Sequence, residues 1–182
     1  LFERMFLLHG ESKYIDCMER TLYNGVISGM SMDGGRFFYP NPLSSDGKYK
    51  FNADGNTTRQ PWFGCACCPS NLCRFIPSVP GYLYGVKDNN IYVNLFAGNT
   101  STIKVNGKDV VLEETTEYPW NGDIKIAVKK SGVKNANLLV RIPGWVRNQV
   151  VPSDLYRYSD AEKPAYSVTV NGKAVEADLD AN

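Results

Sequence analysis

The sequence predicts an α+β protein in which a short helical segment is followed by an antiparallel β-sandwich. Near the N-terminus, apolar residues recur at every third or fourth position, which is typical of amphipathic helices. After residue 80 the chain alternates between apolar and polar residues in short runs separated by turn signals, the pattern of a sandwich. The two patterns meet at Pro77 and Pro80. We therefore expect one domain at residues 1–79 and a second at residues 80–182.

Composition excludes several classes of function. Twenty basic residues balance nineteen acidic ones, for a net charge of +1, and no basic stripe is present. We therefore expect no nucleic-acid partner and no binding to a membrane surface. No apolar run approaches membrane-spanning length, so no integral membrane segment is expected either. The five cysteines are odd in number and irregularly spaced, which disfavours a secreted disulfide framework and leaves the compartment, cytoplasmic or periplasmic, open.

Residues 1–30 predict two helices. Gly10 is the expected end of the first helix, and Ser12 is the expected cap of the second. The second helix carries an apolar stripe of residues spaced four apart, namely Met18, Leu22, Val26 and Met30. Such a stripe indicates a buried face rather than a ligand site. Two helices with wide apolar faces cannot form a core alone, so we expect more helices before Leu1 in a longer parent protein.

Residues 33–62 predict a long irregular connection rich in turn-forming residues. A loop of this length is uncommon in a compact domain unless it builds a site. It carries or adjoins several aromatic residues, namely Phe37, Phe38, Tyr39, Trp62 and Phe63. These residues have two interpretations: packing beneath the loop, which we favour slightly, or the lining of a sugar pocket.

Residues 82–182 predict short strands and hairpins. Residues 82–86 and 91–95 alternate across a turn at Asp88-Asn89-Asn90. Asn106-Gly107 is a preferred two-residue hairpin loop, whose register pairs Ile103 with Val110 and Lys104 with Asp109. This loop belongs to a VNGK motif at residues 105–108. The motif returns at residues 170–173, where it pairs Val168 with Val175. Further strands are expected at residues 124–128 and 138–142, and a polar surface excursion at residues 147–164.

The β-rich half has a functional interpretation of its own, as a carbohydrate-binding or scaffold module. Trp120 and Trp145 would then stack on sugar rings, although we favour buried core or interdomain contacts for both. The chain stops at Asn182 soon after one hairpin, so we also expect truncation at the C-terminus.

The stretch PWFGCACCPSN at residues 61–71 concentrates the reactive chemistry of the chain. It holds three of the five cysteines, Cys65, Cys67 and Cys68. Pro69 follows at once and predicts a helix over residues 70–76 with Cys68 as its N-cap. A helix N-terminus favours thiolate, the form that acts as a nucleophile or metal ligand. Inert, buried cysteines are an equally good interpretation, and a single histidine, His9, leaves a four-ligand zinc site incomplete.

Taken together, five motifs resemble the β-L-arabinofuranosidase family, glycoside hydrolase family 127 and its relatives. They follow the family's order over nearly the whole chain, and the CCPxN signature is the most specific of them. The motifs are ERTLYN (residues 19–24), FFYPNPL (37–43), WFGCACCPSN (62–71), TEYPWNG (116–122) and LLVRIPGW (138–145).

The resemblance implies the end of an (α/α)6-barrel catalytic domain followed by a β-sandwich, from a zinc-dependent retaining glycosidase. Cys67 matches the nucleophile and a zinc ligand, and Cys68 matches a second zinc ligand. Cys65 and Cys73 match no catalytic position, and no substrate-binding residue can be assigned. The remaining family ligands, a glutamate and a cysteine, and the acid/base glutamate belong upstream of Leu1. We therefore expect the parent protein to hydrolyse arabinofuranose-containing glycans, and this chain alone to bind zinc weakly and to be inactive.

Two alternatives stand beside the glycosidase. One is the carbohydrate-binding or scaffold module without chemistry. The other is a thiol redox or structural metal protein, which ranks last because a disulfide between adjacent cysteines is strained.

Overall fold

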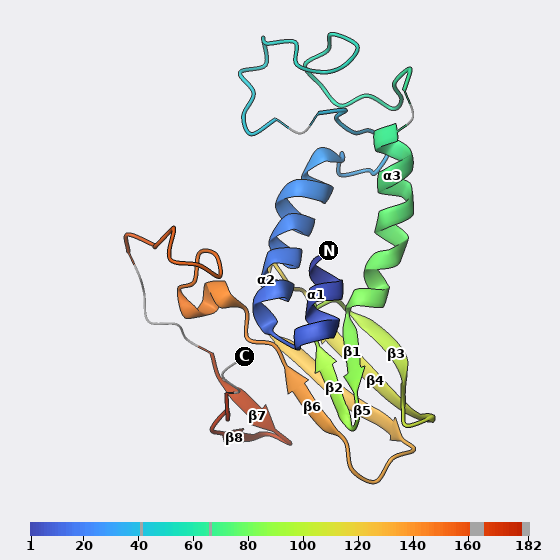
Figure 1. Ribbon diagram of the computed structural model, residues 1–182, viewed down its shortest axis with the longest axis vertical. Coiled ribbons are helices and arrows are strands. Elements are labelled where there is room, and N and C mark those ends of the chain that lie inside the picture. The colour runs from blue at the N-terminus through green and yellow to red at the C-terminus, as the bar shows by residue number, and fades with distance from the viewer. Residues whose placement is uncertain (41, 66, 161–165, 180–182) are drawn as a thin grey trace. The chain divides into compact units, whose positions relative to one another are not determined.

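The computed structural model describes residues 1–40, 42–65, 67–160 and 166–179 and confirms a mixed α+β protein (Figure 1). The α-helices precede the strands along the chain. The chain divides into two compact units, one of residues 18–81 and one of residues 1–17 with 82–182. Asn41 of the FFYPNPL motif, residues 161–164 of the expected excursion and the end of the chain at Asn182 lie outside the described residues.

The N-terminal helices follow the sequence pattern closely. Helix α1 (Phe2–His9) ends at Gly10, whose positive φ of 74° lets its N–H donate to the Phe6 carbonyl at 2.7 Å. Helix α2 (Ser12–Thr21) includes Ser12 as its first residue, so Ser12 is not the preceding cap. The chain continues through a π-helical turn (Leu22–Val26) and a 3-10 turn (Ile27–Gly29), which extends the helical segment almost to the predicted end.

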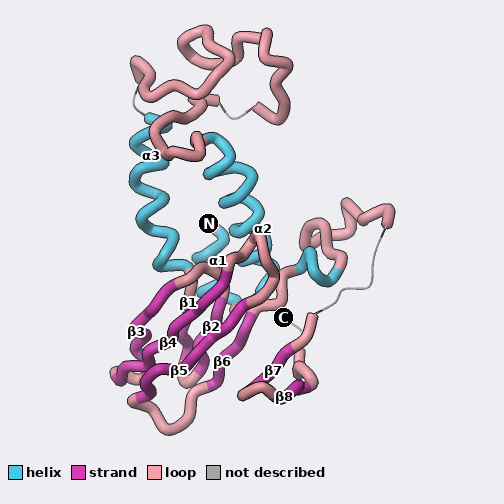
Figure 2. Tube along the Cα trace, turned by 180° about the vertical axis from the view of Figure 1, so that it is seen from behind, coloured by secondary structure: helices cyan, strands magenta, loops and turns pink. Residues whose placement is uncertain are grey.

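The strands form two three-stranded sheets and a separate hairpin (Figure 2). The first sheet has the order β1 (Tyr84–Lys87), β2 (Asn90–Val93), β6 (Asn137–Val140). The second has the order β3 (Asn99–Val105), β4 (Lys108–Thr116), β5 (Ile124–Ser131). The hairpin joins β7 (Val168–Val170) to β8 (Lys173–Val175).

The predicted hairpin registers are confirmed. Ile103 pairs with Val110, Lys104 with Asp109, and Val168 with Val175. Asn106 and Asn171 both have positive φ, at 50° and 51°, as a type I′ loop requires of its first residue. The two sheets share one apolar cluster of buried side chains, made of Ile91, Ile103, Val105, Val110 and Leu112.

Two expectations about the β-rich half are wrong. The pairing is not antiparallel throughout, because β2 and β6 are parallel, with Ile91 opposite Leu138. The chain builds all of the second sheet between these two strands, so no tight turn forces them to run in opposite directions. The buried-core expectation is also wrong for Trp120, which is 89% exposed, and Trp145 is 48% exposed, whereas interdomain contacts of both stay a prediction.

Glu114 is a buried carboxylate that joins the two sheets. It lies on β4, is 2% exposed, and accepts hydrogen bonds from Tyr84 Oη at 3.1 Å and from the Ala97 N–H at 3.2 Å. Asn99 Nδ2 also donates to it at 3.4 Å. Burial raises the pKa of Glu114 above its ordinary value, although these three donors partly oppose the shift.

This pKa shift predicts a pH dependence of stability. Above the unfolded pKa and below the raised folded pKa, the folded chain binds more protons than the unfolded chain, so stability falls as pH rises through that window. We expect Glu114→Gln to remove this fall, as measured by urea unfolding from acidic to neutral pH. Glu113→Gln is the matched control, because Lys129 lowers the pKa of half-buried Glu113 and its contribution has the opposite sign. Identical pH profiles for Glu114→Gln and the wild type would contradict the prediction.

Candidate active site

The cysteine cluster lies at the start of helix α3 (Cys67–Phe75). The helix begins at Cys67, so Cys68 is not its N-cap and Pro69 is its third residue. The N–H groups of a first helical turn have no intrahelical partner, and a proline is therefore tolerated there. The earlier start places both Cys67 and Cys68 in the first turn, at the positive end of the helix dipole.

The sulfur atoms of three cysteines lie close together at this helix end. Cys67 Sγ is 3.5 Å from Cys65 Sγ and 3.7 Å from Cys68 Sγ. Cys65 and Cys67 are exposed, Cys68 is half-buried, and all three are free thiols. Cys67 is therefore not buried, contrary to the interpretation of the cluster as buried, inert cysteines, and its reactivity stays a prediction.

Tyr39 completes the cluster from the long loop. Its Oη lies 3.1 Å from Cys67 Sγ. This hydrogen bond, with further ones from Cys65 and Cys68, lowers the pKa of Cys67 to about 7. The same contact raises the pKa of Tyr39 above its usual range, and burial followed by the contact with Cys67 raises the pKa of Cys68. These opposite shifts favour the proton on Tyr39 and Cys68 and negative charge on Cys67.

The loop that carries Tyr39 is held by buried side chains. The Tyr39 N–H donates to Asn52 Oδ1 at 2.9 Å, and Asn52 Nδ2 donates to the Thr58 carbonyl at 2.9 Å. Asn52 is 4% exposed, so these bonds are shielded from water. The Tyr39 ring packs edge-on against Phe63, with ring centroids 5.5 Å apart, and Phe63 is 2% exposed.

Most of the loop aromatics pack rather than line a pocket. Phe37 is 8% exposed and packs edge-on against Phe63 at 5.2 Å. Phe38 packs against Phe51 and beneath the Arg59 guanidinium, which lies 4.3 Å from its ring centroid. Trp62 differs, because it is 60% exposed. The packing interpretation is thus confirmed for Phe37 and Phe63, whereas Tyr39 combines packing with a polar contact that the sequence did not single out.

The sulfur pair has the spacing that a zinc ion requires. Tetrahedral zinc with Zn–S bonds of about 2.3 Å holds two sulfurs about 3.8 Å apart. The separation of 3.7 Å between the sulfurs of Cys67 and Cys68 matches this value. Among the described residues, no group of three or more His, Cys, Asp or Glu side chains is arranged to hold a metal ion. The pair therefore fits two of four zinc ligands.

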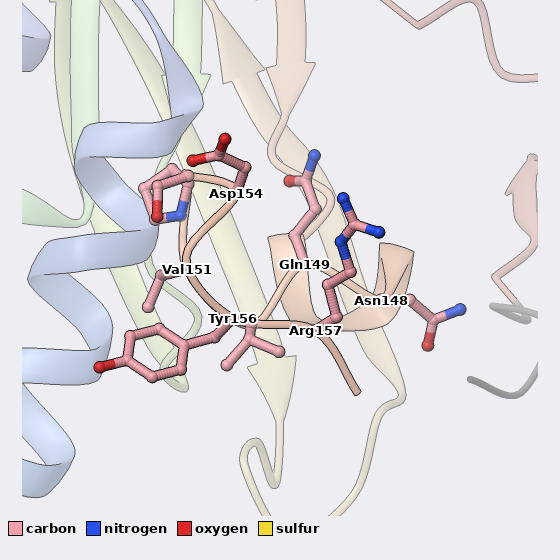
Figure 3. A pocket seen from close by; sticks show the side chains of 9 residues that line it. Asn148, Gln149, Val151, Asp154, Tyr156 and Arg157 are labelled. Carbon is pink, nitrogen blue, oxygen red and sulfur yellow. The ribbon is translucent and has the colours of Figure 1, made fainter. Parts of the chain in front are cut away.

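A pocket in the polar segment at residues 148–157 has a volume of about 410 Å³ (Figure 3). Its lining includes Gln149, Asp154, Tyr156 and Arg157. None of the residues predicted to carry chemistry lies in it. Where residues are described, the chain has no helix long and apolar enough to cross a membrane.

Comparison with known proteins identifies the class of this chain. Residues 1–81 match the catalytic domain of β-L-arabinofuranosidase, GH127, and residues 90–182 match the GH127 middle domain. These matches define parts of a glycoside hydrolase, a catalytic-domain segment followed by a β-rich domain. The chain belongs to the β-L-arabinofuranosidase family, glycoside hydrolase family 127.

Individual relatives agree with this membership. The chain is 30% identical to a non-reducing end β-L-arabinofuranosidase of Bifidobacterium longum subsp. longum, over 98% of this chain and 25% of the relative. A solved GH127 β-arabinofuranosidase is 57% identical, with a TM-score of 0.88 over 98% of this chain and 27% of that one. A GH127 β-L-arabinofuranosidase from Geobacillus stearothermophilus T6 is 37% identical, with a TM-score of 0.73 over 96% and 25%. The chain thus spans about a quarter of the length of these relatives.

Proposed function

We propose that this chain forms part of a retaining glycosidase that acts on β-L-arabinofuranosides of arabinofuranose-containing glycans, with the Cys67 thiolate as its nucleophile. The observation that carries the proposal is the exposed Cys67 sulfur at the first turn of α3, 3.1 Å from the Tyr39 hydroxyl. An accessible sulfur whose negative charge is supported by its neighbours is the chemical requirement for a thiol nucleophile. Membership of the β-L-arabinofuranosidase family supports the choice of sugar.

The proposed reaction has two steps. Cys67 Sγ attacks the anomeric carbon, the glycosidic bond breaks, and an acid protonates the leaving oxygen to leave a glycosyl thioether. Water then displaces the sulfur, and the same residue, now a base, takes the water's proton. We assign the acid/base role to a glutamate outside this chain, as the family resemblance implies.

Cys67 and Cys68 would hold a zinc ion in this enzyme. When bound, zinc supplies charge that keeps a cysteine sulfur deprotonated at neutral pH. The contribution of the chain is to place both sulfurs in one helical turn at the separation that zinc requires. We assign the remaining zinc ligands, a glutamate and a cysteine, to the part of the catalytic domain that this chain does not carry.

The two halves take different places in the proposed enzyme. Residues 1–79 would form the end of an (α/α)6 barrel, and residues 80–182 would form a β-sandwich. Two matches support this division, since the catalytic-domain match ends at residue 81 and the middle-domain match starts at residue 90. The apolar cluster shared by β2, β3 and β4 supports the sandwich.

The proposal is tested with a full-length protein that carries this sequence. We expect it to hydrolyse an aryl β-L-arabinofuranoside with retention at the anomeric carbon, followed by NMR of the first product. Rapid acid quenching and peptide mass spectrometry should locate a sugar on Cys67. A product of inverted configuration, or a sugar attached to another residue, would overturn the proposed nucleophile.

The isolated 182-residue chain is expected to bind zinc weakly and to lack glycosidase activity. Two sulfurs supply only half of the four ligands of a typical protein-bound zinc. Metal analysis after dialysis against a mild chelator should therefore find substoichiometric zinc, and the aryl arabinofuranoside should stay intact. Stoichiometric zinc or measurable turnover would contradict this prediction.

A non-catalytic sugar-binding module is the second candidate. Trp120 is 89% exposed, and Trp145, at 48%, donates from Nε1 to Tyr118 Oη at 3.3 Å. The Tyr118 ring also packs edge-on against buried Phe96, with centroids 5.4 Å apart, so Trp145 is linked to the core. An exposed tryptophan held in this way, as Trp145 is, suits stacking on a sugar ring. Saturable glycan binding by the chain, unchanged by Cys67→Ser, would favour this candidate.

A further inference from the structure

We infer that Tyr39 is a catalytic hydrogen-bond donor to Cys67 Sγ, and that it acts chiefly in the second step, when the sulfur leaves the sugar. This inference rests on the proposed function, because it concerns the same sulfur. It adds a residue from the long loop, 28 positions before Cys67, to the reacting atoms.

The geometry supplies a donor that is fixed in place. Tyr39 Oη lies 3.1 Å from Cys67 Sγ, within hydrogen-bond distance for sulfur. The backbone of Tyr39 is bonded to buried Asn52, and its ring packs on buried Phe63. These two contacts fix the backbone and the ring of Tyr39, so the hydroxyl reaches Cys67 without ordering a mobile side chain during the reaction.

Tyr39 is the strongest side-chain donor near this sulfur. Cys65 and Cys68 also approach it, at 3.5 and 3.7 Å. A thiol, however, is a weak donor, whereas a phenol donates strongly. In a zinc-bound enzyme Cys68 would moreover be a thiolate ligand with no proton to donate. Tyr39 is therefore the neighbour whose removal should change the chemistry of Cys67 most.

The strength of the Tyr39–Cys67 hydrogen bond changes along the reaction. In the first step an Sγ electron pair forms the C–S bond, and the sulfur turns from an anion into a thioether, which is a poor acceptor. In the second step the oxygen of water bonds to the anomeric carbon, the base takes a proton from the water, and the C–S electron pair returns to Sγ. The Tyr39 hydrogen bond therefore weakens in the first step and strengthens in the second, so it favours release of the sulfur.

The test compares Tyr39→Phe with the wild type in the full-length protein. Loss of a hydrogen bond to a charged group should lower kcat roughly 10- to 100-fold by slowing the second step. KM should fall by a similar factor because the glycosyl intermediate accumulates, which leaves kcat/KM nearly unchanged. Intact-mass analysis of the quenched enzyme should show a larger fraction carrying one sugar on Cys67. A residue with only a structural role would lower kcat/KM and would not enrich the adduct.

Tyr49→Phe is the matched control, since Tyr49 lies in the same loop and is 74% exposed. Its kcat, its KM and the fraction of enzyme that carries a sugar should all equal those of the wild type. If Tyr39→Phe leaves kcat unchanged, or lowers kcat/KM without accumulating adduct, the inference is overturned while the nucleophile stands. Loss of turnover and adduct together in Tyr39→Phe also overturns it, because the first step does not require this donor. A wild type that forms no sugar adduct overturns the proposed function as well.

Discussion

Replacing Cys67 with serine in the full-length enzyme is expected to lower kcat on an aryl β-L-arabinofuranoside by about 10⁴-fold or more. The Cys67 sulfur ionises near neutral pH, with its pKa lowered to about 7 by the Tyr39 hydrogen bond and by Cys65 and Cys68. A serine hydroxyl at the same position stays protonated and is a weak nucleophile without an adjacent base. Stopped assays with purified, metal-analysed protein give the rate, and mass spectrometry should find no sugar on the variant.

Cys73→Ser is the control for this variant, because Cys73 is an exposed thiol on the same helix. It should keep wild-type activity and zinc content. Cys68→Ser should lose zinc, which separates metal binding from nucleophilic attack if some turnover remains. Wild-type activity in Cys67→Ser would contradict the thiolate mechanism. Glycan binding without any turnover in the wild type would favour the non-catalytic sugar-binding module instead.

Local structure was the part of this fold that sequence predicted well. The Asn106-Gly107 loop fixed the register of β3 and β4, and the Lys104–Asp109 pair expected from it has Nζ and Oδ1 2.8 Å apart. Gly10 likewise ended α1 as predicted. In both cases the deciding interaction joins residues close in sequence, so the residue types alone specify the backbone.

Contacts between distant parts of the chain were not predictable in the same way. The parallel pairing of β2 with β6 joins residues 47 positions apart, and no turn signal specifies it. The candidate site shows the same difference between features that the local sequence specifies and contacts between distant residues. Residue chemistry and the family motif drew attention to Cys67 and Cys68, whereas Tyr39 was one of several loop aromatics with no feature that marked it. Its role depends on the fold of the loop around Asn52 and Phe63.

The buried ion pair between Arg141 and Asp16 is a long-range contact of this kind, spanning 125 positions. Arg141 Nη1 lies 2.6 Å from Asp16 Oδ1, and Arg141 Nε donates to the Asn94 carbonyl at 2.6 Å. The guanidinium also lies 5.6 Å from the ring centroid of Phe96. The two side chains are only 2% and 15% exposed, so the pair is largely shielded from water. Asp16 of helix α2 is thus bonded to Arg141, the residue directly after β6, and Arg141 is bonded in turn to the Asn94 carbonyl.

Removal of one partner should therefore be costly. We expect Arg141→Met to lower the free energy of unfolding by about 3–5 kcal/mol, because it leaves the Asp16 carboxylate and the Asn94 carbonyl buried without this donor. For a chain of this length, that loss lowers the melting temperature by on the order of 10 °C, which circular dichroism of the 182-residue chain would detect. The double variant Arg141→Met/Asp16→Leu should regain part of the loss, since no lone charge stays buried.

The matched control for Arg141→Met is Lys104→Met, which breaks the exposed Lys104–Asp109 pair and should change stability negligibly because water and salt screen that pair. A second probe is Gly144→Ala, since a Cβ at Gly144 would come within 2.7 Å of Asp16 Oδ2 and displace the carboxylate from Arg141. Gly144→Ala should also lower the free energy of unfolding. If Arg141→Met has the same melting temperature as the wild type, the ion pair does not stabilise this unit. The packing of Ile15 and Phe6 must then hold α1 and α2 in place instead.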